Sequence, residues 1–390
     1  MSTGRPSGDA TKAGNGDIRI LYNATSACVG GGLSYATAQV AALARALSGG
    51  EIVVFASQAN GDELRKVDNV RVRVIHTRGV LWRVLWEQLS LPFHARKYDV
   101  VVSPGNFAVL CSPRPQVVVL QNPNYVGHGR KLAHNRHARR YFEVILSFLS
   151  MQRADAVIVI SDALMAEVAS EPLLRRIRAH VIRSGAPAAP ASTVVGDYSD
   201  VVDDHSGVRQ PYILSVANGY AHKRLEDIAS AFSRTTVRGS LVFVGSISTA
   251  MRHRIELSSG SRVADLVFCG AVGDRSRVDA LYHGASAAVS ASELEAFPLT
   301  PHEAGNAGCP LVLSDIPPHR EVAGDNARYV PVGDVIALAE VLERALRENR
   351  RTAVWSWPIS WEEHGVAALR LIQSVAPKRR PQTDKLLKPG

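Results

Sequence analysis

Short runs of β-branched and other apolar residues recur along the chain, and stretches of helical composition separate several of them. In chain order the runs are 18–23, 51–55, 70–75, 99–103, 116–120, 156–160 and 180–185, then 212–217, 240–245, 265–270, 287–291, 310–314 and 327–331. Nearly continuous apolar strands that alternate with helices are typical of parallel sheets with helices on both faces. The pattern therefore predicts an α/β protein.

The alternation is interrupted once, where residues 186–210 are rich in Pro, Ala, Ser and Asp and have weak periodicity. Such a stretch favours a linker between two doubly wound, Rossmann-like domains. We expect a disordered N-terminus (1–17), a first domain (18–190), a linker (191–210), a second domain (211–355), a C-terminal helix (356–376) and a basic, disordered tail (377–390). Sheets of this kind bind ligands at the carboxyl ends of their strands, so two facing domains would form a cleft.

Composition narrows the class of protein. The 390 residues are 46% hydrophobic and 21% charged, as in soluble globular proteins. The net charge of +9 suits nucleic acid, an anionic membrane or a phosphorylated ligand, but no nucleic-acid-binding motif is present, so we expect no nucleic-acid partner. Four scattered cysteines without CxxC spacing argue against a disulfide scaffold or zinc site and favour the cytoplasm. There is no signal-like stretch and no apolar run of transmembrane length.

Three glycines, Gly30, Gly31 and Gly32, follow the first strand and precede a helical stretch. Glycine lets the backbone approach a ligand closely, and a helix N-terminus favours an anion. The spacing matches neither a dinucleotide fingerprint nor a phosphate-binding loop with its lysine. A flexible strand–helix turn is therefore an equally good interpretation.

Lys223 and Arg224 stand at the start of an amphipathic helix, shortly after the strand at 212–217. Basic residues there oppose the helix dipole, which is a mild local cost. The cost makes sense if an anion such as a diphosphate occupies the site. The alternative is a pair of solvated surface charges.

Residues 292–315 read SELEAFPLTPHEAGNAGCPLVLSD and hold two glutamates. Thr300 at the N-cap, Pro301 at the first helical position and Glu303 at the third predict a capping box, which by itself explains Glu303. Glu295 lies in the loop after the strand at 287–291, where no cap explains it. A carboxylate at that place is able to accept hydrogen bonds from sugar hydroxyls.

These segments, taken in order, resemble the family 4 (group 1) glycosyltransferases of the GT-B fold. The stretch from Glu295 to Glu303 resembles the Glu-x7-Glu motif of that family. Further similarity lies in GGGLSYATAQVAAL, ADAVIVISDAL, HKRLEDIASAF, FCGAVGDRSRVDALYHGASAAVSAS and GCPLVLSDIPPHREV, so that the resemblance spans roughly residues 18–375. It implies two Rossmann-like domains that face each other across a cleft, with the C-terminal helix crossing back to the first domain.

The resemblance also implies an activity. The enzyme would move a hexosyl residue (mannosyl, glucosyl or rhamnosyl) from a nucleotide diphosphate sugar to a hydroxyl of a carbohydrate or lipid-linked acceptor. Family membership implies retention of the anomeric configuration, no metal or cofactor, and a role in cell-surface polysaccharide or glycolipid synthesis. A non-catalytic scaffold subunit of the same fold and a sugar-nucleotide epimerase remain alternatives.

Roles for single residues follow from the same resemblance. Glu295 would contact the donor sugar, Glu303 the ribose and Lys223 the diphosphate. The remaining donor-site residues would be Gly31, Gly32, Arg224, Gly270, Val272, Phe297, Pro298, Leu299 and Thr300, with base contacts from the backbone near Gly270 and Val272. Amides of the helix that starts at Thr300 would face the diphosphate.

The sequence departs from the family pattern in three places. Asn218-Gly219 stands where members often have Gly-Arg, so Arg224 would supply the missing charge. Pro298 replaces a glycine and removes one backbone donor. Gln121-Asn122 stands where many members have a histidine, and His128 is a candidate to face the acceptor in its place, although a surface histidine is the alternative.

Residues 128–153 form a basic, partly apolar segment. Its charged side chains are Arg130, Lys131, Arg136, Arg139, Arg140 and Arg153 against Glu143. A helix of this composition lies on an anionic membrane or packs on the first domain as a solvated helix. The first interpretation predicts a peripheral contact with the inner face of the membrane.

Overall fold

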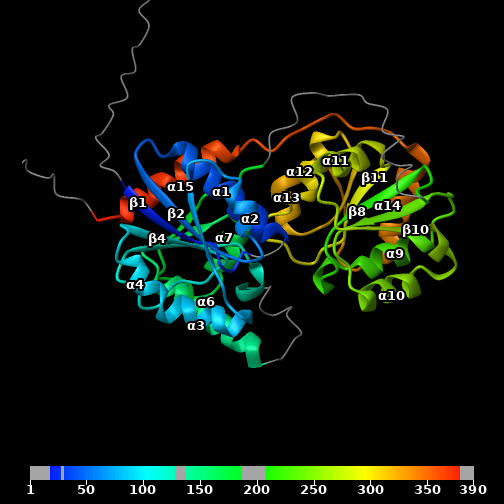
Figure 1. Ribbon diagram of the computed structural model, residues 1–390. Helices are drawn as coiled ribbons and strands as arrows, with labels where there is room; N and C mark the ends of the chain where they lie inside the picture. Colours follow the sequence, from blue (N-terminus) through cyan, green and yellow to red (C-terminus); the bar gives the residue numbers. More distant parts are fainter. Residues whose placement is uncertain (1–17, 28–29, 128–137, 187–206, 378–390) are drawn as a thin grey trace, which may run out of the picture.

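The computed structural model describes residues 18–27, 30–127, 138–186 and 207–377, and it has two parallel sheets with helices on both faces (Figure 1). The predicted disordered termini, most of the predicted linker and His128 lie outside the described residues. Each of the thirteen predicted strands is present, and the strand ends differ from the prediction by a few residues at most. The predicted fold class, two Rossmann-like domains, is confirmed.

The first sheet has seven strands in the order β3-β2-β1-β4-β5-β6-β7. They are β1 (Ile18–Asn23), β2 (Gly50–Ser57), β3 (Arg71–Ile75), β4 (Val100–Pro104), β5 (Gln116–Leu120), β6 (Ala156–Val159) and β7 (Ala179–Val181). The helices are α1 (Gly30–Ala46), α2 (Gly61–Arg65), α3 (Gly79–Leu89), α4 (Leu91–Ala95), α6 (Ala138–Arg153) and α7 (Asp162–Ala169), with short 3₁₀ helices η1 (Pro123–Tyr125) and η2 (Pro172–Leu174). The strand order reverses between β1 and β4, and such a reversal is where α/β sheets bind ligands.

The second sheet has six strands in the order β10-β9-β8-β11-β12-β13. They are β8 (Tyr212–Val216), β9 (Ser240–Val244), β10 (Leu266–Gly270), β11 (Ala287–Ser290), β12 (Leu311–Ser314) and β13 (Arg328–Val330). The helices are η3 (Ala221–Lys223), α9 (Leu225–Ser233), α10 (Thr249–Ser258), η4 (Gly260–Asp265), α11 (Arg275–Gly284), α12 (Thr300–Asn306), α13 (Pro317–Ala323) and α14 (Val335–Glu348). Here the order reverses between β8 and β11, so the loops after these two strands are the expected ligand loops.

Helix α15 (Trp361–Val375) returns to the first domain, as predicted, and lies beside α1 (Figure 1). Its residues Ala368, Leu369 and Ile372 belong to the hydrophobic core of that domain. His364 on α15 lies 3.1 Å from the hydroxyl of Tyr35 on α1. The chain therefore passes twice between the domains, and the first domain is completed by the last helix.

Helix starts show where local sequence rules hold. At α15 the side chain of Ser360 accepts from the Glu363 amide and the Glu363 carboxylate accepts from the Ser360 amide, which completes a capping box. At α12 the predicted capping box is wrong, because the N-cap is Leu299 and no side chain caps the helix. Thr300 instead donates to the carbonyl of Val216 at 3.3 Å.

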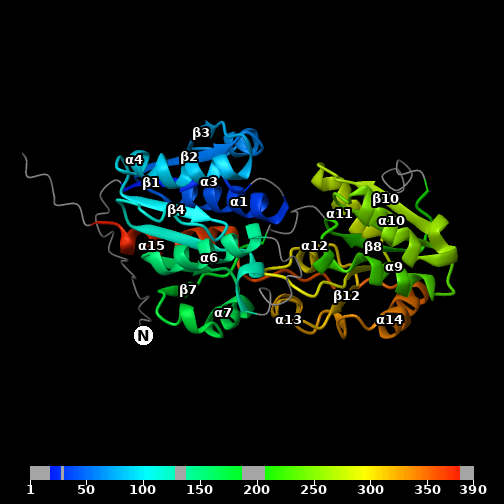
Figure 2. The same cartoon turned by 90° about the horizontal axis from the view of Figure 1, so that it is seen from below.

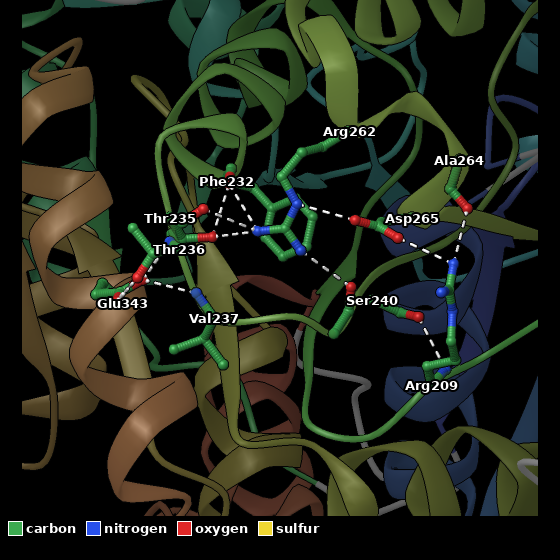
Figure 3. Close-up of polar contacts among 11 residues, drawn as sticks. Arg209, Phe232, Thr235, Thr236, Val237, Ser240, Arg262, Ala264, Asp265 and Glu343 are labelled. Carbon is green, nitrogen blue, oxygen red and sulfur yellow. Dashed lines mark hydrogen bonds and ion pairs between the residues drawn. The ribbon is translucent and has the colours of Figure 1, made fainter.

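A polar network holds the second domain at the amino ends of its strands, away from the cleft (Figure 3). Glu343 on α14 accepts from the Thr236 amide and hydroxyl, each at 2.7 Å. Arg262 donates to the Thr235 hydroxyl at 2.6 Å and to Asp265 at 2.9 Å. These bonds join α14 and η4 to the segment that precedes β9, so this end of the domain is structural.

Candidate active site

A cavity of about 340 Å³ lies between the two domains. The first domain lines it from η1 and α7, and the second domain lines it from the loops after β11, β12 and β13 and from the start of α13. The lining residues are Pro123, Ala163, Leu164, Glu167, Glu293, Leu294, Glu295, Asp315, Ile316, Pro317, Pro318 and Val332. The cavity is therefore at the carboxyl ends of the strands, where the sequence predicted the cleft, and Figure 2 shows α7, α12 and α13 at this junction.

Glu295 and Lys223 meet beside this cavity. Lys223 ends η3 in the loop after β8, and Glu295 lies in the loop after β11, the neighbouring strand. The ammonium of Lys223 donates to Oε1 of Glu295 at 2.5 Å, and the two side chains are 21% and 12% exposed. Burial alone raises the pKa of Glu295, but the ammonium of Lys223 outweighs burial and lowers this pKa below its ordinary value. The carboxylate of Glu295 is therefore ionised at neutral pH.

Two histidines flank the ion pair. His319 on α13 is buried, and its Nδ1 lies 2.8 Å from the carbonyl of Ser314. Burial lowers the pKa of His319, and burial together with Lys223 lowers the pKa of His222. Because both imidazoles are neutral, the charges around the ion pair come from Lys223, Arg224 and the carboxylates. His319 lies within the segment that carries the resemblance, but no pattern in the sequence pointed to it.

Arg224 is the N-cap of α9 and has a left-handed backbone with φ of 51°. Its guanidinium donates to Asp227 at 2.6 Å and to Glu293 at 3.2 Å. Both carboxylates already neutralise it, so its predicted role on the diphosphate stays a prediction. The structure places Arg224 near the site, and its ion pairs with Asp227 and Glu293 also give it a structural role.

Glu303 is held by two side chains from α11. Its carboxylate accepts from Arg275 at 2.6 Å and from the Tyr282 hydroxyl at 2.7 Å. Burial first, and then Glu303, raises the pKa of Tyr282 well above its ordinary value, so Tyr282 remains a donor. Arg275 follows Val272 by three residues, so Glu303 lies close to the loop predicted to bind the base. Sequence reasoning missed Arg275 and Tyr282.

Two glycine segments approach the cleft from opposite domains. The three glycines were expected to precede the helix. In the structure α1 begins at Gly30, so the glycines form its first turn. A Cβ on Gly30 would lie 3.2 Å from Nδ2 of Asn218, so these loops meet across the cleft. Gly31 faces open space, and Gly270 has φ of 68° with open space before it. Space for the predicted backbone approach is open at Gly31 and Gly270, whereas the Cβ position of Gly32 lies 3.9 Å from Oε1 of Gln121.

Of the remaining predicted donor-site residues, Phe297 belongs to an aromatic cluster with His302 and Trp357. Phe297 stacks on His302 with centroids 5.0 Å apart and contacts Trp357 edge-on at 5.5 Å. Pro298 is buried, and Leu299 and Val272 are half-buried. Burial lowers the pKa of His302 to about 4, so its ring is neutral. The cluster supports the loop of Glu295, and donor contacts by Phe297, Pro298, Leu299, Thr300 and Val272 stay predictions.

Direct hydrogen bonds join the two domains at the site. The hydroxyl of Ser161 donates to the carbonyl of Ala296 at 2.7 Å, beside Glu295. The carboxylate of Glu321 on α13 accepts from the amides of Asp162 and Ala163 at 2.9 and 2.8 Å, at the N-terminus of α7. Ser161 and Glu321 were not predicted as inter-domain contacts, because nothing in the sequence shows that α7 faces α13.

Two Rossmann-like domains that face each other across this cavity have the architecture of the GT-B class of enzyme. Residues 29–189 match the family described as Glycosyltransferase Family 4, and residues 203–356 match Glycosyl transferases group 1. These two matches together span most of the chain, which therefore belongs to the group 1, family 4 glycosyltransferases and is a transferase.

Solved structures share the fold. HepE from Anabaena, in complex with UDP and glucose, superposes with a TM-score of 0.68 at 16% identity, over 91% of this chain and 95% of that one. A glycosyltransferase from Rickettsia africae gives 0.66 at 15% identity, over 93% and 99%. WaaG, involved in lipopolysaccharide biosynthesis, gives 0.64 at 16%, over 91% and 97%. No curated protein matches the sequence.

Proposed function

We propose that the enzyme transfers a hexosyl residue from a nucleotide diphosphate hexose to an acceptor hydroxyl with retention, in cell-surface polysaccharide or glycolipid synthesis. The ion pair of Lys223 and Glu295, 2.5 Å apart and largely buried beside the inter-domain cavity, carries this proposal. It brings a fixed cation and a fixed carboxylate to the place where a donor sugar and its diphosphate would meet.

Lys223 has the donors that the leaving group requires. An ammonium group donates three hydrogen bonds, and Glu295 takes one of them, which leaves two for diphosphate oxygens. Breaking the anomeric bond leaves negative charge on the diphosphate. One preorganised donor in such a site lowers the barrier by about 2.7–4 kcal/mol. Glu295, kept ionised by Lys223, would accept hydrogen bonds from sugar hydroxyls.

Glu303 suits the ribose. Its two oxygens are oriented by Arg275 and Tyr282, and each carboxylate oxygen has a further lone pair for a ribose hydroxyl. The structures of HepE contain UDP, UDP and glucose, or UDP-glucose. WaaB is described as a lipopolysaccharide outer core galactosyltransferase. UDP-hexoses are therefore the first donors to test, and a surface glycan or glycolipid is the first acceptor class.

The test is a donor panel of UDP-, GDP- and dTDP-sugars, scored by thermal shift and followed by transfer assays with the best donor. Glu295→Ala and Lys223→Ala should each lower turnover by at least a hundredfold, the loss expected for one electrostatic group. Glu340→Ala, on the exposed side of α14, is the matched control and should keep normal turnover. Near-normal turnover of both site variants would contradict the assignment of Lys223 and Glu295 to the active site. Release of an altered donor without acceptor would instead indicate an epimerase.

Metal independence is part of the proposal. Lys223 supplies positive charge where many transferases use a metal ion, and this supports chemistry without one. Removal of divalent metals with EDTA should leave the transfer rate within twofold of the untreated rate. A loss that Mg²⁺ or Mn²⁺ restores would overturn this part.

A further inference from the structure

Helix α3 presents its apolar side to solvent. Leu81, Trp82, Leu85 and Leu89 are 68%, 60%, 39% and 66% exposed, and their spacing of one, three and four residues places them on one helical face. Phe93 on α4, four residues further on, is 64% exposed. A contiguous apolar stripe on the outside of a soluble domain marks an interaction site.

The inward side of α3 combines one aromatic contact with polar bonds, and Trp86 packs on the apolar core with its ring 5.7 Å from that of Phe55. Glu87 is buried and accepts from the Thr25 hydroxyl at 2.5 Å. Gln88 donates to the carbonyl of Ala108 and accepts from the Leu110 amide, both at 2.9 Å. Trp86 and these polar bonds hold the helix to the domain while Leu81, Trp82, Leu85 and Leu89 face outward, so the exposed stripe is built into the fold.

A second stripe of the same form lies on α6. Tyr141, Phe142, Ile145 and Leu149 are 62%, 54%, 58% and 41% exposed and have the same spacing. Crossovers that run in one direction along a parallel sheet put their helices on one face. Accordingly α3, α4 and α6 lie on the same face of the first sheet (Figures 1 and 2).

The rim of these stripes is basic. Residues 71–97 contain Arg71, Arg73, Arg78, Arg83, Arg96 and Lys97 against one acid, the buried Glu87. Arg73, Arg78, Arg96 and Lys97 are exposed. None of the helices within the described residues has the length and apolar character of a membrane span. Apolar side chains within a basic rim complement a surface that is apolar below and anionic above.

We propose that the outer face of α3, α4 and α6 docks the enzyme on an anionic lipid membrane, with Leu81, Trp82, Leu89 and Phe93 inserted among the acyl chains. Buried apolar area and attraction to anionic headgroups together set the strength of such binding. The inference extends the predicted contact of residues 128–153 to α3 and α4. The basic residues of that segment, apart from Arg153, lie outside the described side chains.

The test is co-sedimentation of the full chain with vesicles of phosphatidylcholine alone or with 40% phosphatidylglycerol, without donor or acceptor. Binding should require the anionic lipid and weaken with salt. Leu81→Glu/Trp82→Ser should reduce it at least tenfold, and Arg78→Glu or Lys97→Glu about fivefold per charge removed. Leu257→Glu, at a residue 69% exposed on α10 of the other domain, is the matched control and should bind normally.

Three outcomes would overturn this proposal. They are equal binding to both vesicle types, unchanged binding of Leu81→Glu/Trp82→Ser, and a wild-type dimer in ultracentrifugation that this variant dissociates. The last outcome would identify the surface as an interface between copies of the chain. Because binding is measured without transfer, the result is independent of the proposed reaction.

Discussion

Glu303 bonds to residues distant in the sequence and leaves the start of its own helix uncapped. Its partners Arg275 and Tyr282 are 28 and 21 residues away. A buried carboxylate is stabilised more by a guanidinium and a phenol than by the backbone amide of a half-exposed turn. The tertiary environment therefore overrides the capping pattern that the local sequence has.

Substitution of Glu303 tests the ribose role. Glu303→Gln should weaken UDP binding about tenfold or more, because a hydrogen bond to a charged group contributes about 1.5–3 kcal/mol. Isothermal titration with UDP measures the change. Asp279→Asn removes the other carboxylate partner of Arg275, at 3.2 Å, and should bind UDP almost normally. Equal losses in both variants would assign the effect to Arg275.

At the scale of elements, the strands were predictable and the helix ends were less so. Parallel strands buried on both faces leave a continuous apolar run in the sequence, and each such run became a strand. Glu295 and Lys223 each belong to a motif within a single loop, and the structure brings the two side chains together beside the inter-domain cavity, while their roles on the donor stay predictions. Ser161, Glu321, Arg275 and Tyr282 were missed because their partners come from other elements, and a single sequence does not show which elements meet.

The packing of α15 on α1 gives a prediction of stability. A Cβ on Gly365 would lie 2.7 Å from the backbone carbonyl carbon of Ala42. Gly365→Ala should therefore lower the free energy of unfolding by about 1–3 kcal/mol through overpacking. Urea denaturation measures it. Gly273→Ala, where a Cβ meets nothing within 4 Å, is the control and should change stability little.

The contact between α14 and the segment before β9 gives a pH prediction. Burial raises the pKa of Glu343, but hydrogen bonds from Thr236, Val237 and Arg347 outweigh it and lower this pKa to about 2. A depressed carboxyl pKa stabilises the fold above the unfolded value near 4.5, and this contribution fades as pH falls from 4.5 towards 2. Glu343→Gln should be less stable than the wild type at pH 7, by about 1–3 kcal/mol.

Denaturation at two pH values completes that test. The gap between the wild type and Glu343→Gln should shrink between pH 7 and pH 2.5. Glu256→Gln, which removes an exposed i,i+4 partner of Arg252, is the control and should show a gap of less than about 1 kcal/mol at both values. A gap for Glu343→Gln that stays constant with pH would contradict the role given to this carboxylate.

At the scale of the whole molecule, Glu321 and Ser161 couple the domains around the site. Glu321→Ala leaves two amides at the N-terminus of α7 without their carboxylate acceptor and removes a favourable charge from the helix dipole. Since domain closure excludes water, we expect transfer to fall about tenfold (from about 1.4 kcal/mol) and hydrolysis of the donor to rise relative to transfer.

The two rates are separable in one assay that measures free sugar and glycosylated acceptor. Glu256→Ala, an ion pair confined to the second domain, is the control for this variant as well. An unchanged total rate and an unchanged division between water and acceptor in Glu321→Ala would contradict this role. The inter-domain bonds of Glu321 would then make no contribution to domain closure.

The return of α15 also has a consequence for synthesis on the ribosome. The first domain ends its last strand at Val181, but its core requires Ala368, Leu369 and Ile372. At roughly 5–20 residues per second, the intervening chain takes roughly 10–40 s to emerge. During that interval the groove on α1 that receives α15 stays open. The nascent first domain is thus a natural client for a chaperone, and the second domain completes its own core first.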